Sequence, residues 1–412
     1  MRGLIEIKSC EVCGSSEMQS VLDLGTHPLC DDLVPVGDSR VCHEYPIELL
    51  YCQTCFTIHQ RFQVPKLELF PKTYHYRSRF TADVLSGMRA LVASCKVRLV
   101  DLTGKAVLDI GCNDGSLLDF FREEGSKTIG MEPTDAWNDA SKKGHRIYHD
   151  FFSPVSASTV FKNHGSPDVI TLTNVFAHIE NLPEVIEALG KLIAPQTLLV
   201  VENHYLGSVL DGFQFDTFYH EHARTYSVTS FLHIARSLGV SINGVEFPSR
   251  YGGNIRVFMS RTARVGNDGL FADIAKRESQ YLAAFGKLQT FMHKWQTSMK
   301  DRIRLLISRY GTLSAKAFPG RAAILVKMLG INERSVCAVF EKPGSMKIGH
   351  YLPGTRIPIK SDDELFSAPQ KPQVLLNMAW HISEEIRKYL KLHHFEGEVI
   401  DILDPKEFSR NS

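Results

Sequence analysis

Apolar and polar positions along the middle of the chain predict alternating strands and helices. Residues 105–111 form a largely apolar, β-branched run that ends in Gly111, and residues 112–116 are rich in turn formers. The apolar pattern resumes at residues 117–121, so this stretch predicts strand, glycine-rich turn and helix. Residues 127–131 and 169–174 have the same apolar character and predict two further strands. The pattern therefore favours an α/β sheet of the doubly wound type.

The C-terminal third repeats this alternation. Residues 270–310 carry apolar side chains near helical spacing, which predicts helix with a stripe for core or interdomain packing. The stripe comprises Ile274, Leu282, Phe285, Leu288, Phe291 and Trp295. Residues 324–331 resume an apolar pattern, and residues 336–341 and 374–377 are short apolar runs typical of strands. Because helices alternate with these strands, we expect a second parallel sheet.

Acidic residues and glycines surround the turn after the first strand. Gly111 and Gly115 allow the backbone to pass close to a ligand, and Asp109 and Asp114 favour a cationic ligand over a pyrophosphate. Their G-x-x-x-G spacing is not the G-x-G-x-x-G of nicotinamide dinucleotide sites. Glu132 ends the next predicted strand 23 residues after Asp109, at the distance of a ribose-binding carboxylate. The alternative is a sheet that uses these glycines only for turns.

The pattern D-x-G-x-x-x-G resembles motif I of class I S-adenosylmethionine-dependent methyltransferases. Two later positions extend the likeness: Asp150 precedes a Phe-Phe pair where such enzymes often hold adenine, and Asn174 ends the fourth-strand pattern. The resemblance implies an S-adenosylmethionine site. Its expected residues are Asp109, Gly111, Asn113, Asp114, Gly115, Glu132, Asp150 and Asn174.

Two C-x-x-C pairs predict a structural zinc site near the N-terminus. Each pair can place two thiolates on one side of a tight turn, and two such turns complete a tetrahedral site without an open position. The pairs bracket 38 residues, for which we expect a small hairpin or loop, and their ligands are Cys10, Cys13, Cys52 and Cys55. A redox pair would need a thioredoxin-like βαβ context, and none is apparent here, so four unrelated thiols are the alternative. Substitute ligands from the intervening stretch would be His27, Cys30, Cys42 and His43.

Imidazoles and a carboxylate are concentrated in two further segments. His178 follows a predicted strand, at the sheet edge where ligands collect in open α/β folds, although a capping or packed histidine is the plain alternative. Tyr219-His220-Glu221-His222 places four polar side chains in succession. The spacing is not H-E-x-x-H, so a metalloprotease is excluded. Chelation by H-x-H stays possible, as does an acid/base pair in which Glu221 orients or tunes His222.

With these motifs the chain resembles a family of sugar C-methyltransferases that act on nucleotide-linked 4-keto deoxysugars. The matching segments run through almost the whole chain. Besides the two C-x-x-C pairs they are Leu24-Gly25-x-x-Pro28-Leu29, Tyr74-x-Tyr76-x-Ser78, Asn113-Asp114-Gly115, Phe176-Ala177-His178-Ile179, Phe215-Asp216-Thr217-x-Tyr219-His220-Glu221-His222 with Tyr226-Ser227, Tyr251-Gly252-Gly253-x-x-Arg256-Val257, and Tyr351-Leu352-Pro353-Gly354-Thr355-x-Ile357-Pro358.

The resemblance implies a reaction and roles for five residues. A ketone at C4 acidifies the proton on C3, a base removes that proton, and the resulting enolate attacks the sulfonium methyl group. His222 matches the proposed base of the family and Glu221 its companion carboxylate, while Tyr76, His178 and Tyr219 match its other active-site positions. For the two tyrosines alone, core packing is the alternative. The reaction itself needs no metal.

The implied architecture has three parts. They are a zinc-binding lobe over residues 1–70, a class I (Rossmann-like) methyltransferase domain over residues 71–265, and a second Rossmann-like α/β domain over residues 266–412 that contributes to the sugar-nucleotide site. We expect the sugar between the last two parts. Where the family has the loop G-A-P-A-K-G-N, this chain has Ala317-Phe318-Pro319-Gly320-Arg321-Ala322-Ala323. Arg321 can grip phosphate bidentately, so the loop either defines a different substrate or serves as scaffold.

The amino-acid composition limits the classes of partner that the protein is expected to bind. Lys plus Arg is 47 and Asp plus Glu is 46, giving a formal charge of +1 over 412 residues. That balance argues against a whole-chain grip on nucleic acid or anionic lipid. No stretch approaches the length of a membrane-spanning helix, and the first residues lack an apolar core of signal-peptide length, so we expect a cytoplasmic protein with no membrane partner. Nine cysteines, an odd number, argue against a disulfide framework.

Three rival functions remain at this level. A small-molecule O- or N-methyltransferase with a structural zinc lobe would not need the His222–Glu221 pair. A methyltransferase whose zinc lobe recognises RNA or protein is disfavoured by the lack of basic clusters around the cysteines. A non-catalytic binding protein would leave the ionisable residues at 220–222 unexplained. The sequence leaves the nucleotide base, the sugar, the stereochemistry and the oligomeric state open.

Overall fold

The computed structural model describes residues 3–71, 74, 76–262 and 268–406. The chain divides into two compact units, each built from three separate segments. The first unit comprises Met1–Val21, Leu49–Val209 and Glu221–Leu282, and the second comprises Leu22–Glu48, Leu210–His220 and Ala283–Ser412. Among the described residues, no helix is both long and apolar enough to cross a membrane.

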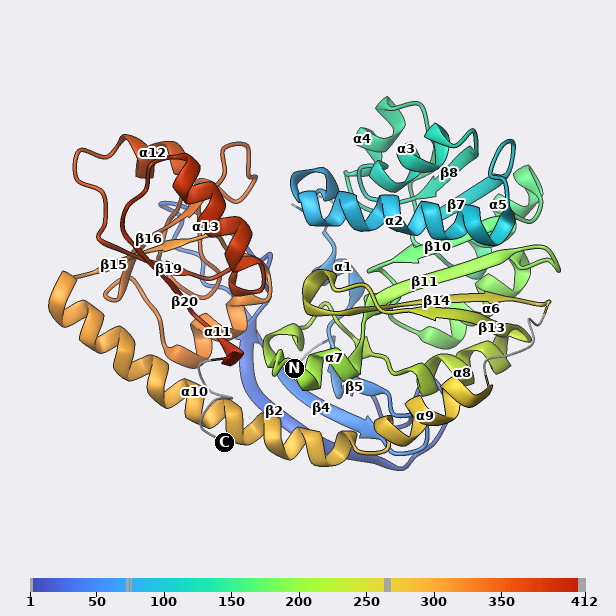
Figure 1. Ribbon diagram of the computed structural model, residues 1–412, viewed down its shortest axis with the longest axis horizontal. Coiled ribbons are helices and arrows are strands. Elements are labelled where there is room, and N and C mark those ends of the chain that lie inside the picture. Colours follow the sequence, from blue (N-terminus) through green and yellow to red (C-terminus); the bar gives the residue numbers. More distant parts are fainter. Residues whose placement is uncertain (1–2, 72–73, 75, 263–267, 407–412) are drawn as a thin grey trace. The chain divides into compact units, whose positions relative to one another are not determined.

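A seven-stranded sheet forms the centre of the first unit (Figure 1), with the order β13-β14-β11-β10-β7-β8-β9. Its strands are β7 (Ala106–Ile110), β8 (Lys127–Met131), β9 (Arg146–Tyr148), β10 (Val169–Thr173), β11 (Leu198–His204), β13 (Ser241–Glu246) and β14 (Asn254–Ser260). β14 runs antiparallel to both of its neighbours, β11 and β13, whereas the pairs from β11 to β9 are parallel. The three strands predicted from the pattern are confirmed as β7, β8 and β10.

Helices cover both faces of this sheet because its strands alternate apolar side chains between two cores. Val107 belongs to a core with α2 and α3, and Leu108 belongs to the opposite core with α5, α6 and α8. Figure 1 shows α2 and α6 on opposite faces. The helices are α2 (Ala82–Leu99), α3 (Ser116–Glu123), α4 (Trp137–Lys142), α5 (Pro154–His164), α6 (Leu182–Leu192), α7 (Leu206–Asp211), α8 (Val228–Leu238) and α9 (Asp268–Glu278).

Local sequence explains where several of these helices begin and end. Ser227 starts α8 with a capping box, in which Ser227 and Ser230 each accept the backbone N–H of the other. α8 ends at Gly239, whose φ of +63° suits a residue without a Cβ. Asn181 caps α6, and a proline occupies its first turn, where a missing N–H costs nothing.

The cysteine pairs lie beside a smaller sheet with the order β12-β5-β4-β2. Its strands are β2 (Met18–Pro28), β4 (Glu44–Cys52), β5 (Ile58–Gln60) and β12 (Arg224–Thr225). β12 pairs antiparallel with β5, with Arg224 opposite His59. The 38 residues between the cysteine pairs therefore contain two long strands in place of a small hairpin. Short elements nearby are β1 (Ile5–Glu6), β3 (Val34–Pro35), β6 (Phe62–Gln63), α1 (Lys66–Leu69) and the 3-10 turn η1 (Ser78–Phe80).

The second unit contains the predicted second parallel sheet, with the order β18-β16-β15-β19-β20. Its strands are β15 (Leu313–Lys316), β16 (Val336–Glu341), β18 (Ile359–Ser361), β19 (Val374–Asn377) and β20 (Glu398–Asp401); its helices are α11 (Ala322–Leu329), α12 (Asp362–Ser367) and α13 (Ser383–Leu392). β17 (His350–Tyr351) pairs with β3. Short 3-10 turns of this unit are η2 (Phe215–Thr217) and η4 (Trp380–Ile382), whereas η3 (Arg250–Gly252) belongs to the first unit. The α/β fold class is thereby confirmed in both sheets.

The segment predicted as helical over residues 270–310 is two helices, α9 and the 30-residue α10 (Tyr281–Tyr310). Most of the predicted stripe is buried, with Leu288 and Trp295 fully inaccessible. Leu282 differs, because it is 40% exposed. The helical spacing thus predicted the buried face of α10 but not its first turn.

Candidate active site and metal centre

The turn after β7 requires glycine at two positions. Gly111 has φ +72° and Gly115 has φ +75°, both in the left-handed region. A Cβ on Gly111 would lie 2.5 Å from Val175 Cγ2, and one on Gly115 would lie 2.9 Å from Ala140 Cβ. The glycines therefore allow close packing within the protein, a reason different from the ligand approach expected from the sequence. Asn113, between them, also has positive φ, +51°.

Gly111→Ala should destabilise the first unit by more than the backbone cost of placing alanine in a left-handed conformation. Gly239 has a similar φ of +63°, and a Cβ added there would meet open space, so Gly239→Ala isolates the backbone cost of about 1 kcal/mol. Gly111→Ala adds the clash with Val175, which we expect to cost about 2 kcal/mol more. Urea unfolding of both variants measures the difference; equal losses would show that Val175 moves aside freely.

Asp109 and Glu132 are buried acids at the ends of β7 and β8. Asp109 Oδ1 accepts a hydrogen bond of 2.7 Å from Thr171 Oγ1 on β10. Glu132 Oε2 accepts from the backbone N–H of Asn113, and Oε1 from that of Thr134, both at 2.9 Å. Burial raises the pKa of Asp109 to about 7, with a smaller contribution from the charge of Glu132, and burial also raises the pKa of Glu132.

The raised pKa of Asp109 predicts a pH-dependent stability. Ionising this carboxyl is harder in the folded than in the unfolded protein, where the pKa is about 3.9. Its contribution is therefore fully favourable below about pH 4 and is lost as pH rises toward 7. We expect the unfolding free energy of the donor-free protein to fall by about 3 kcal/mol more between pH 5 and pH 8 than that of Asp109→Asn. Urea unfolding at both pH values tests this, and identical pH slopes would contradict it.

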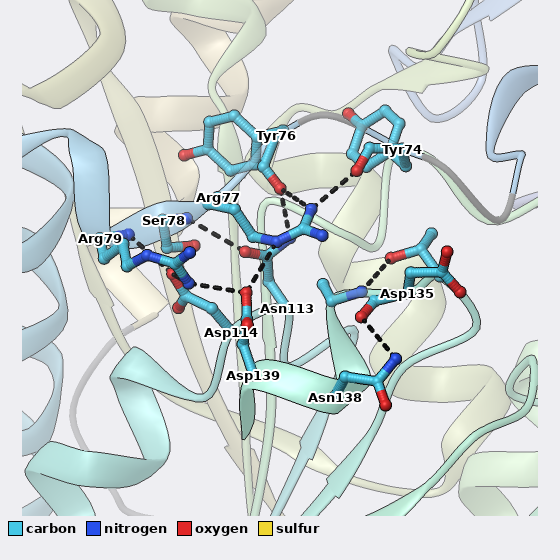
Figure 2. Close-up of polar contacts among 12 residues, drawn as sticks. Tyr74, Tyr76, Arg77, Ser78, Arg79, Asn113, Asp114, Asp135, Asn138 and Asp139 are labelled. Carbon is cyan, nitrogen blue, oxygen red and sulfur yellow. Dashed lines mark hydrogen bonds and ion pairs between the residues drawn. The ribbon is translucent and has the colours of Figure 1, made fainter. Parts of the chain in front are cut away.

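The side chains of Asn113 and Asp114 anchor the segment that carries Tyr76 (Figure 2). Asn113 Oδ1 accepts from the backbone N–H of Ser78, and Asp114 Oδ2 from that of Arg79, both at 3.0 Å. Asn113 Nδ2 donates to the carbonyl oxygen of Tyr76 at 3.1 Å. Two of the predicted donor-binding residues thus hold a predicted active-site residue in place, with Tyr76 itself 39% exposed.

Arg77 reinforces this anchor, and sequence reasoning missed it. Its guanidinium is 7% exposed and donates to the carbonyl oxygens of Tyr74 and Tyr76 at 2.7 and 2.9 Å. Its Nε also donates to Asp139 Oδ2, which accepts from Arg79 as well. The hydrogen bond from Arg79 is the main favourable contribution that lowers the pKa of Asp139. Asp139 therefore stays ionised and fixes both arginines.

Three imidazoles and a carboxylate gather beyond the ends of β10 and β11. The ring centroids of His178 and His222 are 4.9 Å apart, and those of His204 and His222 are also 4.9 Å apart. Glu221 Oε2 lies 3.9 Å from His178 Nδ1 and accepts a 3.1 Å hydrogen bond from Tyr74 Oη. His222 and Glu221 are 6% and 4% exposed. The structure thus brings together His178, Glu221 and His222 within the first unit.

Electrostatics favour a neutral imidazole at His178. Burial, together with the nearby His222, lowers the pKa of His178 well below its usual value. A neutral imidazole has a free lone pair on one nitrogen, which is the requirement for a proton acceptor. An imidazole in this state, as at His178, can take up a proton from a bound carbon acid or polarise a bound oxygen.

His204 is a further member that sequence reasoning missed. It is the last residue of β11, and the rule that placed His178 at a strand end applies equally to it. Nearby, buried Glu202 on the same strand pairs with Arg250 and Arg256. The side-chain nitrogen Nδ2 of Asn254 donates to Glu202 Oε1 at 3.0 Å and to Asn174 Oδ1 at 3.2 Å, and so connects these ion pairs to Asn174.

The remaining predicted positions have other surroundings. Asp150 is exposed and accepts from the backbone N–H of Phe151. Tyr219 belongs to the second unit, where its ring lies near Gly320. In the same unit, Arg321 donates to both carboxylate oxygens of Asp216 at 2.8 and 2.6 Å. The planar edge of the guanidinium, which could grip a phosphate, is thus engaged by Asp216, and this favours the scaffold interpretation of the loop.

The four predicted cysteines form a compact metal-ligating group. Their sulfur atoms all lie within 4.8 Å of one another, and within the described ranges this is the one such cluster of His, Cys, Asp or Glu. The Cys10–Cys55 and Cys13–Cys52 sulfurs are 3.4 and 3.5 Å apart. A tetrahedron with Zn–S bonds of about 2.3 Å has edges of about 3.8 Å, so the four thiols fit zinc after a small expansion.

The backbone at the two pairs forms equivalent turns. The N–H of Gly14 bonds to the carbonyl of Cys10, and the N–H of Phe56 bonds to that of Cys52. The residue that closes each turn has a left-handed backbone conformation, with φ +77° at Gly14 and +58° at Phe56. In addition, His59 Nε2 lies 3.3 Å from Cys10 Sγ, an outer contact typical of metal-bound thiolates.

Comparison with known families assigns three consecutive regions. Residues 10–70 match the family described as "Putative zinc binding domain", residues 83–242 the family described as a methyltransferase domain, and residues 249–402 the C-methyltransferase C-terminal domain. Together with the parallel sheet and its glycine turn, these matches define a class I methyltransferase fold. The protein is a methyltransferase with a cysteine-rich zinc-binding region.

One relative spans nearly the whole chain. The C-methyltransferase NovU of Streptomyces niveus is 26% identical over 415 residues, covering 98% of each protein. Among solved structures, magnesium protoporphyrin IX methyltransferase from Synechocystis PCC 6803 is 16% identical with a TM-score of 0.33, covering 44% of this chain and 80% of the other. The structure of 1,6-didemethyltoxoflavin-N1-methyltransferase of Burkholderia thailandensis is 12% identical with a TM-score of 0.34, covering 45% of this chain and 81% of the other.

Proposed function

We propose that the protein is an S-adenosylmethionine-dependent C-methyltransferase of a nucleotide-linked 4-keto sugar, acting at C3. The observation that carries the proposal is the cluster of His178, His222 and Glu221 at the strand ends of a methyltransferase domain. Carbon methylation needs a base for a C–H proton, whereas transfer to an amine or hydroxyl does not. The match of residues 249–402 to a C-methyltransferase domain and the relative NovU support the same choice.

The turn after β7 and the end of β8 would hold the donor. Gly111, Gly115 and Asn113 shape this turn, and the buried carboxylates of Asp109 and Glu132 flank it. Carboxylate oxygens at this place can accept from ribose hydroxyls and attract a sulfonium, whose bound form supplies an activated methyl group. Asp114, Asp150 and Asn174 are proposed to complete the site at the same sheet edge.

His222 is proposed to act as the base. Its imidazole takes the proton from C3, the electron pair of that C–H bond forms the enolate of the C4 ketone, and C3 then bonds to the methyl carbon as the carbon–sulfur bond breaks. Glu221 holds the imidazole orientation, and His178 stays neutral beside it. The hydroxyl of Tyr76, in the same unit, would stabilise the enolate oxygen. The role of Tyr219 stays a prediction from the sequence.

The cysteine site is proposed to bind zinc in a structural role. Cys10, Cys13, Cys52 and Cys55 would supply all four ligands, which leaves no coordination position for water or substrate. Zinc bound there would fix the two turns and take no part in methyl transfer. We retain the division into lobe, methyltransferase domain and C-terminal domain at residues 1–70, 71–265 and 266–412 as part of this proposal.

The test uses S-adenosylmethionine, a panel of nucleotide-linked 4-keto sugars and deuterated water, read by mass spectrometry. We expect one sugar to gain a methyl group, and its C3 proton to exchange with solvent when the donor is omitted. A methylated product without enzyme-dependent C3 exchange would indicate O-methylation instead. Donor turnover without any sugar product would contradict the proposed substrate class.

A further inference from the structure

We propose that the buried Glu11–Arg224 ion pair positions the histidine cluster, so that the cysteine turns set the geometry of the proposed base. Glu11 lies inside the first C-x-x-C pair, and Arg224 lies two residues after His222. Both belong to the first unit. The inference rests on the proposed function for the role of His222, but its structural basis is independent of the substrate.

The guanidinium of Arg224 is fully buried and contacts three different parts of the unit. Its Nη1 donates to Glu11 Oε2, its Nη2 donates to the carbonyl oxygen of Ile179, and its Nε donates to Tyr226 Oη at 2.9 Å. Ile179 follows His178 directly. Tyr226 Oη in turn donates to the carbonyl oxygen of Phe176 at 3.4 Å. Arg224 and Tyr226 together therefore hold the backbone on both sides of His178.

Glu11 completes the connection on the cysteine side. Its Oε1 accepts from the backbone N–H of Leu182, the first residue of α6, at 3.3 Å. Its Oε2 accepts from Gln63 Nε2 at 2.9 Å and lies 3.7 Å from His59 Nδ1. One carboxylate thus connects the first cysteine turn to Arg224 and to the helix that follows His178.

β5 and the second cysteine turn hold the chain that follows His222. Ala223 O accepts from the N–H of Gln60, where β12 adds to the edge of β5. Farther along, the hydroxyls of Ser227 and Ser230 both lie 3.1 Å from the carbonyl oxygen of Cys55. The segment after His222 is therefore bound at three successive points, once to β5 and twice to the turn that contains Cys55.

This arrangement is better explained by positioning than by stability. A buried ion pair seldom adds net stability over apolar packing, because desolvation offsets the Coulombic gain. A guanidinium with three acceptors in fixed directions, however, determines the relative placement of the groups it joins, and lysine cannot reproduce that geometry. The pair has this form, with one acceptor next to a metal ligand and another next to a proposed catalytic imidazole.

The experiment compares Arg224→Lys and Glu11→Gln with the wild type by hydrogen–deuterium exchange, zinc content, donor affinity and turnover. Asp168→Asn serves as the matched control, because Asp168 accepts the N–H of Ala106 at the opposite ends of β7 and β10. In Arg224→Lys and Glu11→Gln we expect at least about 10-fold faster exchange in peptides covering residues 175–182 and 220–227, and unchanged exchange in residues 106–123. Turnover should fall about 10- to 100-fold, with zinc content kept and donor affinity within about 2-fold.

The outcomes separate the two proposals. Wild-type exchange over 175–182 and 220–227 in both variants would overturn the positioning role, as would faster exchange spread equally over residues 106–123. If Arg224→Lys fails to fold, Glu11→Gln, which keeps the shape of the side chain, decides by the same criteria. Local loosening in the variants of a protein that methylates no keto sugar would support the positioning role and overturn the proposed function.

Discussion

Replacing His222 by alanine is expected to lower the methyl-transfer rate by about 10³-fold or more while donor affinity stays within about 2-fold. General bases typically contribute about 10²- to 10⁴-fold. His222 is 6% exposed and its ring contacts those of His178 and His204, so its removal deletes the central imidazole of the cluster. Turnover, donor binding by calorimetry and C3 exchange in deuterated water measure the effect.

A matched control distinguishes loss of the base from general damage. His233 is a half-buried imidazole on α8 of the same unit that takes no part in the ring contacts of the cluster, and His233→Ala should keep wild-type turnover. In the wild type the methyl-transfer rate should decrease as the pH is lowered below the pKa of the base, since a protonated imidazole cannot accept the C3 proton. If His222→Ala still exchanges that proton at the wild-type rate, His222 is not the base.

Cys52→Ser should have the largest effect on stability, because it removes one of the four proposed zinc ligands. Cys52 is fully buried and its sulfur lies 3.5 Å from that of Cys13. Binding energy at a structural zinc site is folding energy, so we expect loss of the metal and a decrease in unfolding free energy of about 4 kcal/mol or more. Metal analysis by mass spectrometry and thermal unfolding measure both quantities.

The exposed Cys337 provides the control for this substitution. Cys337→Ser changes the same atom outside the cluster and should alter the unfolding free energy by less than about 0.5 kcal/mol, with full zinc content. Chelation of the wild type should reproduce the Cys52→Ser phenotype. A protein that contains no zinc after expression in zinc-rich medium, and that loses no stability in Cys52→Ser, would contradict a structural metal.

Local sequence patterns predicted much of the fold. The first and last residues of β8, β16 and β19 coincide with the ends of the apolar runs, because buried parallel strands need apolar side chains on both faces. The cysteine quartet was predicted by spacing alone, since each pair forms its own turn. The donor-binding and catalytic roles stay predictions, although the structure does bring His178, Glu221 and His222 together.

Contacts between distant segments were beyond the reach of pattern analysis. Glu11 and Arg224 are separated by 213 positions, and nothing in the residues around either indicates the other. Arg77 was missed because its acceptors are two nearby carbonyls and Asp139, none of which has a sequence signature. His204 had a usable signal, its place at the end of β11. The division at residues 1–70, 71–265 and 266–412 stays a prediction.

The interleaved composition of the two units has a consequence for synthesis on the ribosome. The first unit needs residues up to 282, yet residues 22–48 belong to a unit whose last segment starts at 283. The unit that contains this early segment therefore cannot be completed until the residues after 282 have been made. Vectorial folding of one finished domain after another is not available to this chain. Truncation after residue 282 would leave residues 22–48 and 210–220 without their unit, and such a chain should be a ready client for chaperones.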